Sequence, residues 1–68
     1  MEDYFYQALK KRYQSEIAGY KGELEILWAG SFSALECSEI LPRIDRSLEG
    51  LVRAEEKLET LERHYKPE

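Results

Sequence analysis

A chain of 68 residues forms one small domain at most, and a domain of this length buries only about 60% of the surface that its unfolded chain exposes. The net charge of −4 argues against non-specific binding to nucleic acid or to an anionic membrane surface. One cysteine and one histidine exclude an intramolecular disulfide and a His/Cys metal site, so self-association or a partner is the remaining source of stability.

The first predicted element is a helix over about residues 3–29. Apolar side chains recur at steps of three and four residues, which places them on one stripe of a helix. This stripe consists of Phe5, Leu9, Tyr13, Ile17, Tyr20, Leu24 and Leu27. Gly30 follows the last of them, where a left-handed glycine commonly ends a helix.

The segment 30–38 is the predicted connection between two helices, and it is long for a connection within a helical bundle. It contains two apolar residues, Phe32 and Leu35, among mostly polar neighbours. We expect both side chains to fold back over the end of the helix pair.

The second predicted element is a helix over about residues 39–65, and its start has two candidates. Ser33 and Glu36 have the spacing of a capping box, whereas Ser38 is a second N-cap candidate. We favour Ser38, because Pro42 is tolerated in the first turn of a helix but not deeper. The apolar stripe of this helix consists of Ile40, Leu41, Ile44, Leu48, Leu51, Leu58, Leu61 and Tyr65, with Ala54 completing the spacing.

The two helices have nearly equal lengths, about 40 Å each, which predicts an antiparallel hairpin in a single domain over residues 1–68. In that arrangement, residues whose numbers add up to roughly 68 face each other across the pair. Leu27 then faces Leu41, and Tyr20 faces Leu48. The residues predicted to hold the hairpin together are Leu24, Leu27, Leu41, Ile44, Leu48 and Leu51.

A hairpin of two helices has one line of contact and no third layer, so part of each apolar stripe is left uncovered. Two hairpins packed face to face would form a four-helix bundle and close that gap. The residues predicted at such an intermolecular contact are Tyr4, Phe5, Trp28, Phe32 and Val52. The alternative is that these side chains only widen the stripe that faces the core.

Small residues recur every seven positions on the other side of the first helix, at Ala8, Ser15, Gly22 and Ala29. A glycine inside a helix costs about 1 kcal/mol relative to alanine, so the close approach of another helix is one explanation. A solvent-exposed small face or a local bend is the other, and we favour it.

No catalytic, cofactor-binding or metal-binding residue is predicted. Catalysis needs a nucleophile, a base and a stabilising group in one concave pocket, which a single hairpin does not offer. Glu36 and Glu39 oppose the formation of a thiolate at Cys37, so an inert loop cysteine is expected. His64 is expected to be a surface residue stabilised by the helix C-terminus.

Two segments carry a family resemblance, Tyr-Gln-Ala-Leu-Lys-Lys-Arg-Tyr-Gln-Ser-Glu-Ile over residues 6–17 and Ala-Glu-Glu-Lys-Leu-Glu-Thr-Leu-Glu-Arg-His-Tyr over residues 54–65. In these segments the chain resembles short, uncharacterised helical proteins of tailed bacteriophages. The resemblance implies a helical hairpin and makes a viral accessory or virion component an option. It implies no functional residues.

We therefore predict a non-enzymatic interaction module without cofactors, which assembles with itself or with another helical protein through an apolar helix face. A small adaptor, inhibitor or chaperone that binds a larger protein is the first alternative. A nucleic-acid-associated factor that uses Lys10, Lys11 and Arg12 is the weaker one. The acidic opening Met1-Glu2-Asp3 differs from a secretory signal, so a cytoplasmic or virion location is expected.

Overall fold

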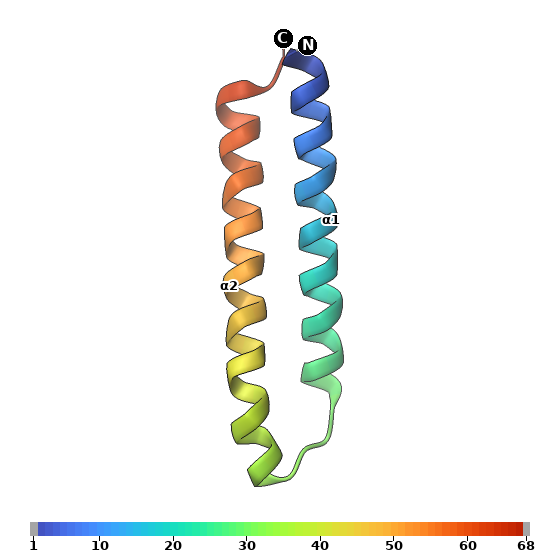
Figure 1. Cartoon of the computed structure of the whole chain (residues 1–68), viewed down its shortest axis with the longest axis vertical. Coiled ribbons are helices and arrows are strands. Elements are labelled where there is room, and N and C mark those ends of the chain that lie inside the picture. Colours follow the sequence, from blue (N-terminus) through green and yellow to red (C-terminus); the bar gives the residue numbers. More distant parts are fainter. Residues whose placement is uncertain (1, 68) are drawn as a thin grey trace.

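The structure is a computed structural model that describes residues 2–67, with the side chain of Glu2 excepted. Two helices, α1 (Glu2–Ala29) and α2 (Ala34–Tyr65), run antiparallel and pack along their length. The first turn of α1 and the last turn of α2 therefore lie at the same end of the rod, opposite the short connection (Figure 1). No strand occurs within the described residues. This confirms the predicted all-α hairpin. Residues 1 and 68, which complete the predicted domain, lie outside the described residues.

The hairpin is a rod of 52 × 15 × 13 Å. Its Cα radius of gyration is 15.7 Å, whereas a compact chain of this length has about 11 Å. The accessible surface is 5587 Å², compared with about 4,500 Å² for a compact protein of this mass. One contact between two helices therefore leaves most of the side-chain surface in water.

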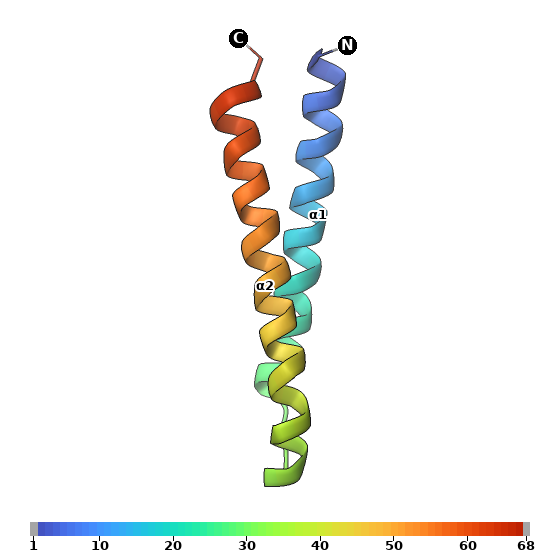
Figure 2. The same ribbon diagram turned by 60° about the vertical axis from the view of Figure 1, so that its left-hand side comes forward.

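The contact between the helices follows two lines of residues spaced seven apart, which we call the seam. A spacing of seven keeps a line of side chains facing a partner helix that runs at a small angle, as in Figure 2. All five buried residues of the described chain lie on these lines. The seam consists of Tyr6, Tyr13, Tyr20 and Leu27 on α1 and of Ile40, Ser47, Ala54 and Leu61 on α2.

The seam places bulky side chains of α1 against small residues of α2. The ring of Tyr20 lies over Gly50, next to the seam, and a Cβ atom built on this glycine would lie 2.5 Å from Tyr20 Cε1. Ser47 and Ala54, one on each side of Gly50 along α2, are buried. The small residues therefore let the tyrosine approach the backbone of α2 closely.

The predicted register agrees with the seam, but the predicted rotation of α2 about its axis is wrong. Leu41 and Leu48, expected to face α1, are 63% and 42% exposed. Each directly follows a seam residue, Ile40 or Ser47, and is therefore turned by about 100° away from the line of contact. In the middle of the rod, α2 therefore turns Ser47, Gly50 and Ala54 toward α1 instead of Leu41 and Leu48.

The second helix begins at Ala34, five residues before the predicted start, so the connection spans 30–33 instead of 30–38. Ser33 is the N-cap, and its Oγ accepts a hydrogen bond of 3.2 Å from the Glu36 backbone N–H. The Ser33 backbone N–H donates to Glu36 Oε1 at 3.4 Å, which completes a capping box. The box places Pro42 inside the helix, where its missing N–H removes one helical hydrogen bond.

The connection also differs from expectation at its glycine. No glycine among the described residues has a positive φ, so Gly30 is not a left-handed helix end. The Phe32 ring folds back over Gly30 instead, and a Cβ atom there would lie 2.5 Å from Phe32 Cε2. The expected folding back is therefore found for Phe32, whereas Leu35 is exposed on the first turn of α2.

The capping box yields a test of where α2 begins. We expect Ser33→Ala to lower the free energy of unfolding by about 1 kcal/mol, because the Glu36 backbone N–H loses the Ser33 Oγ atom as its hydrogen-bond acceptor. Ser38→Ala is the matched control, since Ser38 Oγ only donates to the carbonyl of Leu35 within the helix. Urea denaturation of both variants measures the difference. A larger loss for Ser38→Ala would restore the later start.

The seam yields a test with two glycines. A Cβ atom at Gly22 meets nothing within 4 Å, so Gly22→Ala should stabilise the hairpin by about 1 kcal/mol through helix propensity alone. Gly50→Ala gains the same propensity but displaces the Tyr20 ring, and we expect net destabilisation. In a Tyr20→Ala background, Gly50→Ala should become stabilising. Thermal unfolding followed by circular dichroism measures all three, and equal effects at both glycines would contradict the packing.

Candidate interaction surface

The seam divides the rod into two long faces of different chemistry. A residue three positions after a seam residue is turned by about 60° to one side, and a residue four positions after it by about 40° to the other. Because the helices are antiparallel, the same offsets on α1 and α2 lie on the same face of the pair. The residue directly after a seam residue lies further around on the side of the four-residue offset.

The face at the three-residue offset is polar over the middle of the rod. Two shallow hollows lie along it, beside Tyr20, and both are lined by carboxylates from α1 and cations from α2. Their charged linings are Glu16, Glu23, Arg43, Arg46, Arg53 and Lys57. We call this the polar face.

No ion pair joins the two helices within the described residues. The three ion pairs present link residues four apart on one helix: Arg12–Glu16 at 3.4 Å, Arg53–Glu49 at 3.4 Å, and Arg63–Glu59. All involve exposed side chains, for which such pairs contribute at most about 1 kcal/mol. These ion pairs therefore act within a single helix, and packing along the seam holds the two helices together.

The opposite face is apolar in the half of the rod near the connection. Its eight positions are those that lie one or four residues after a seam residue, and seven of the eight are apolar. They are Ile17, Lys21, Leu24 and Trp28 on α1 and Leu41, Ile44, Leu48 and Leu51 on α2. We call this set the apolar face.

The apolar face has a half-buried floor and exposed edges. The side chains at the four-residue offset, among them Ile17 and Leu51, are half-buried because they pack beside the seam. The side chains at the edges are exposed: Trp28 is 73% exposed, and Leu41 on the other helix is similarly open. Trp28 also lines a shallow apolar hollow with Leu24 at the end of α1. The arrangement offers a wide apolar contact without a cavity.

The five residues predicted at an intermolecular contact do not form one surface. Trp28 belongs to the apolar face, and Val52 borders it, one turn after Leu48 and 49% exposed. Tyr4 and Phe5 are exposed at the open end of the rod, where their rings meet edge to face with centroids 5.8 Å apart. Phe32 is half-buried over Gly30.

Sequence reasoning missed Leu41 and Leu48 as surface residues, because it assigned them to the contact within the hairpin. The signal that separates the two roles is the matched spacing of the seam lines. Tyr6, Tyr13 and Tyr20 are seven residues apart, and so are Ser47 and Ala54. A leucine directly after such a line has to lie outside it.

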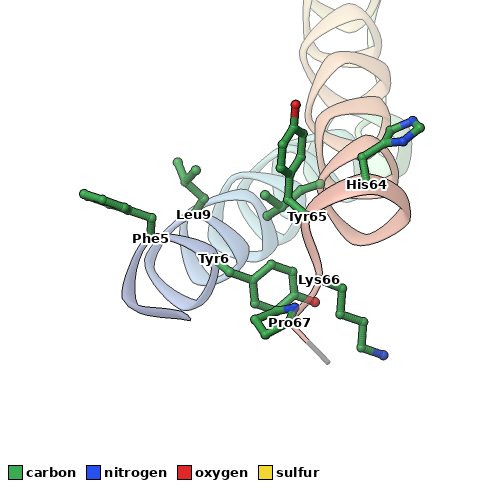
Figure 3. A pocket seen from close by; sticks show the side chains of 8 residues that line it. Phe5, Tyr6, Leu9, His64, Tyr65, Lys66 and Pro67 are labelled. Carbon is green, nitrogen blue, oxygen red and sulfur yellow. The ribbon is translucent and has the colours of Figure 1, made fainter. Parts of the chain in front are cut away.

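A second apolar hollow lies at the open end, on the three-residue side, and Figure 3 shows it from close by. Tyr6 from α1 and Leu61 from α2 form its buried part, and Phe5, Leu9, His64, Tyr65, Lys66 and Pro67 surround them. Tyr6 is only 4% exposed, and its hydroxyl group has no hydrogen-bond partner. The ring is therefore held by packing. Its hydroxyl group has lost its hydrogen bonds to water and has gained none in the protein, which costs stability.

The small-residue face of α1 is not explained by packing within the hairpin. A Cβ atom at Gly19 or Gly22 would meet nothing within 4 Å. Ala8, Ser15 and Ala29 are exposed. The hairpin itself therefore does not require a glycine at either position.

The described residues contain no group of three or more His, Cys, Asp or Glu side chains placed to hold a metal ion. Cys37 is exposed, and its Sγ lies 3.8 Å from the carbonyl oxygen of Phe32. Neither α1 nor α2 has, over the described residues, the length and apolarity needed to cross a bilayer. The structure thus defines a helical hairpin with one polar and one apolar face.

Comparisons with models of protein families, with characterised proteins and with solved structures found no match to this chain.

The unpaired hydroxyl of Tyr6 yields a test of the open end. We expect Tyr6→Phe to leave the free energy of unfolding unchanged or to raise it by about 1 kcal/mol, because it removes a buried group without a partner. Tyr6→Ala should lower it by about 3 kcal/mol or more, through the loss of the buried ring. Chemical denaturation of both variants measures this. A clear loss of stability in Tyr6→Phe would show that the hydroxyl forms a hydrogen bond.

Proposed function

We propose that this protein is a non-enzymatic interaction module that acts by burying its apolar face against helices of another chain. The observation that carries the proposal is the continuous apolar face near the connection, with Trp28, Leu41 and Leu48 exposed at its edges. Large contiguous apolar patches on a soluble chain commonly mark a protein contact.

The energetics favour docking as the use of this face. Burying one leucine side chain stabilises a complex by about 1.5–3 kcal/mol. Leu41 and Leu48 add nothing of that size to the isolated hairpin, because both are turned away from α1. A partner helix laid along the half-buried floor would cover both edges, which is the usual way in which amphipathic helices recognise an apolar surface.

The biological setting that we propose is a bacteriophage accessory or virion component. It rests on the resemblance of residues 6–17 and 54–65 to short helical phage proteins. The docking role does not depend on this setting, because it follows from the apolar face itself.

Trp28 yields the test of the docking role. Trp28→Ala should weaken association of the chain by about tenfold or more and leave its helicity unchanged, because the side chain lies at the edge of the apolar face. Ile26→Ala is the matched control: Ile26 is 75% exposed on the same helix but precedes the seam, away from that face. Light scattering and circular dichroism on the same samples measure both effects. Unchanged mass with a collapsed helical signal would assign Trp28 to the fold instead.

A further inference from the structure

We propose that the occupant of the apolar face is a second copy of this chain, so that two hairpins pack face to face into a four-helix bundle. The inference rests on the proposed docking role and names the partner. Its support comes from the surface area of the chain, the charges on the face and the limits of the face along the rod.

The surface area of the chain exceeds that of a compact protein by somewhat more than a dimer contact of standard size removes. The 5587 Å² of the hairpin is about 1,100 Å² more than a compact monomer of this mass exposes. A protein–protein interface of standard size buries about 800 Å² on each partner. One contact over the apolar face therefore brings each chain close to the surface of a compact domain, and it adds the layer that the hairpin lacks.

The apolar face is compatible with a copy of itself. In a two-fold symmetric dimer the same patch lies on both sides of the contact, so a charge inside the patch is buried twice and has to find its partner within that patch. Lys21 is the only charged residue among the eight positions, and its long side chain can place the ammonium group at the rim.

The apolar face ends where charges begin, which limits the contact to the half near the connection. Continued toward the open end, the same offsets carry Lys10 on α1 and Glu55 and Glu62 on α2. The apolar part spans about 20 Å of helix, from the level of Leu51 to that of Trp28. A second copy buries the most apolar surface when these two halves overlap.

The test uses three leucines of α2 that are exposed in the hairpin. Leu41→Lys and Leu48→Lys place a charge on the apolar face. Leu35→Lys places the same charge on the first turn of α2, outside the apolar face. Leu41 and Leu35 are 63% and 75% exposed, so neither change disturbs the hairpin. Mass by light scattering is recorded from about 1 μM to about 1 mM, with circular dichroism on each sample.

We expect the unchanged chain and Leu35→Lys to be dimers, and Leu41→Lys and Leu48→Lys to be helical monomers. Because each substitution occurs twice in a symmetric dimer, the dissociation constant should rise by about 100-fold or more. If Leu48→Lys loses helicity, Leu41→Lys alone decides whether the dimer forms through the apolar face, because Leu41 is the more exposed of the two.

Two contrary outcomes separate this inference from the docking role. If the unchanged chain is a helical monomer throughout, the second copy is excluded. Fluorescence of the apolar dye anilinonaphthalene sulfonate, present for that monomer and lost in Leu41→Lys, would then keep the apolar face as a docking surface for another protein. If the chain dimerises equally well with all three substitutions, the second copy binds at another surface and this inference is wrong. Dye fluorescence that is absent from the unchanged chain, or that is equal in Leu41→Lys, would contradict the docking role itself.

Discussion

The packing of tyrosine side chains against small residues of α2 is the interaction on which the rest of the structure depends. Tyr20 lies over Gly50, between the levels of Ser47 and Ala54, and this contact sets how α2 is rotated about its axis. A larger side chain in the line of Ser47 and Ala54 would push the helices apart. Tyr13 and Tyr20 are half-buried, so their hydroxyl groups can form hydrogen bonds with water.

The same rotation determines the surface of the molecule. Once the small residues face α1, the leucines that follow them in sequence have to lie on one long face, and the residues three positions on have to lie on the other. On α2 the first set includes Leu41 and Leu48, and the second includes Arg43 and Lys57. Segregation of apolar and charged side chains is therefore a geometric consequence of the seam.

The sequence predicts the two helices, their antiparallel arrangement and the register, because apolar periodicity and a short connection leave few alternatives. It does not predict the rotation of α2. An apolar stripe marks the residues that leave water, but it does not say whether the partner is the same chain or another. Leu41 and Leu48 fit the apolar periodicity of α2, but the structure leaves both exposed instead of placing them against α1.

The predicted start of α2, near residue 39, differs from the observed start at Ala34 because two local effects oppose each other. Pro42 argues for a late start because it removes a helical hydrogen bond, whereas the capping box of Ser33 and Glu36 satisfies two backbone groups at an early one. The early start adds residues 34–38, among them Cys37, to α2. Of the residues predicted at an intermolecular contact, Trp28 on α1 and Val52 on α2 are exposed beside the seam.

The exposed leucines carry a consequence for how such a small chain remains folded. A hairpin that turned Leu41 and Leu48 inward would bury more apolar surface by itself, and that burial opposes the conformational entropy lost on ordering each residue. This chain instead closes its seam with Ser47 and Ala54, whose side chains bury little area. Its largest unused source of apolar stabilisation therefore lies on its surface. Any partner that covers the apolar face also stabilises the fold, so that folding and docking draw on the same leucines.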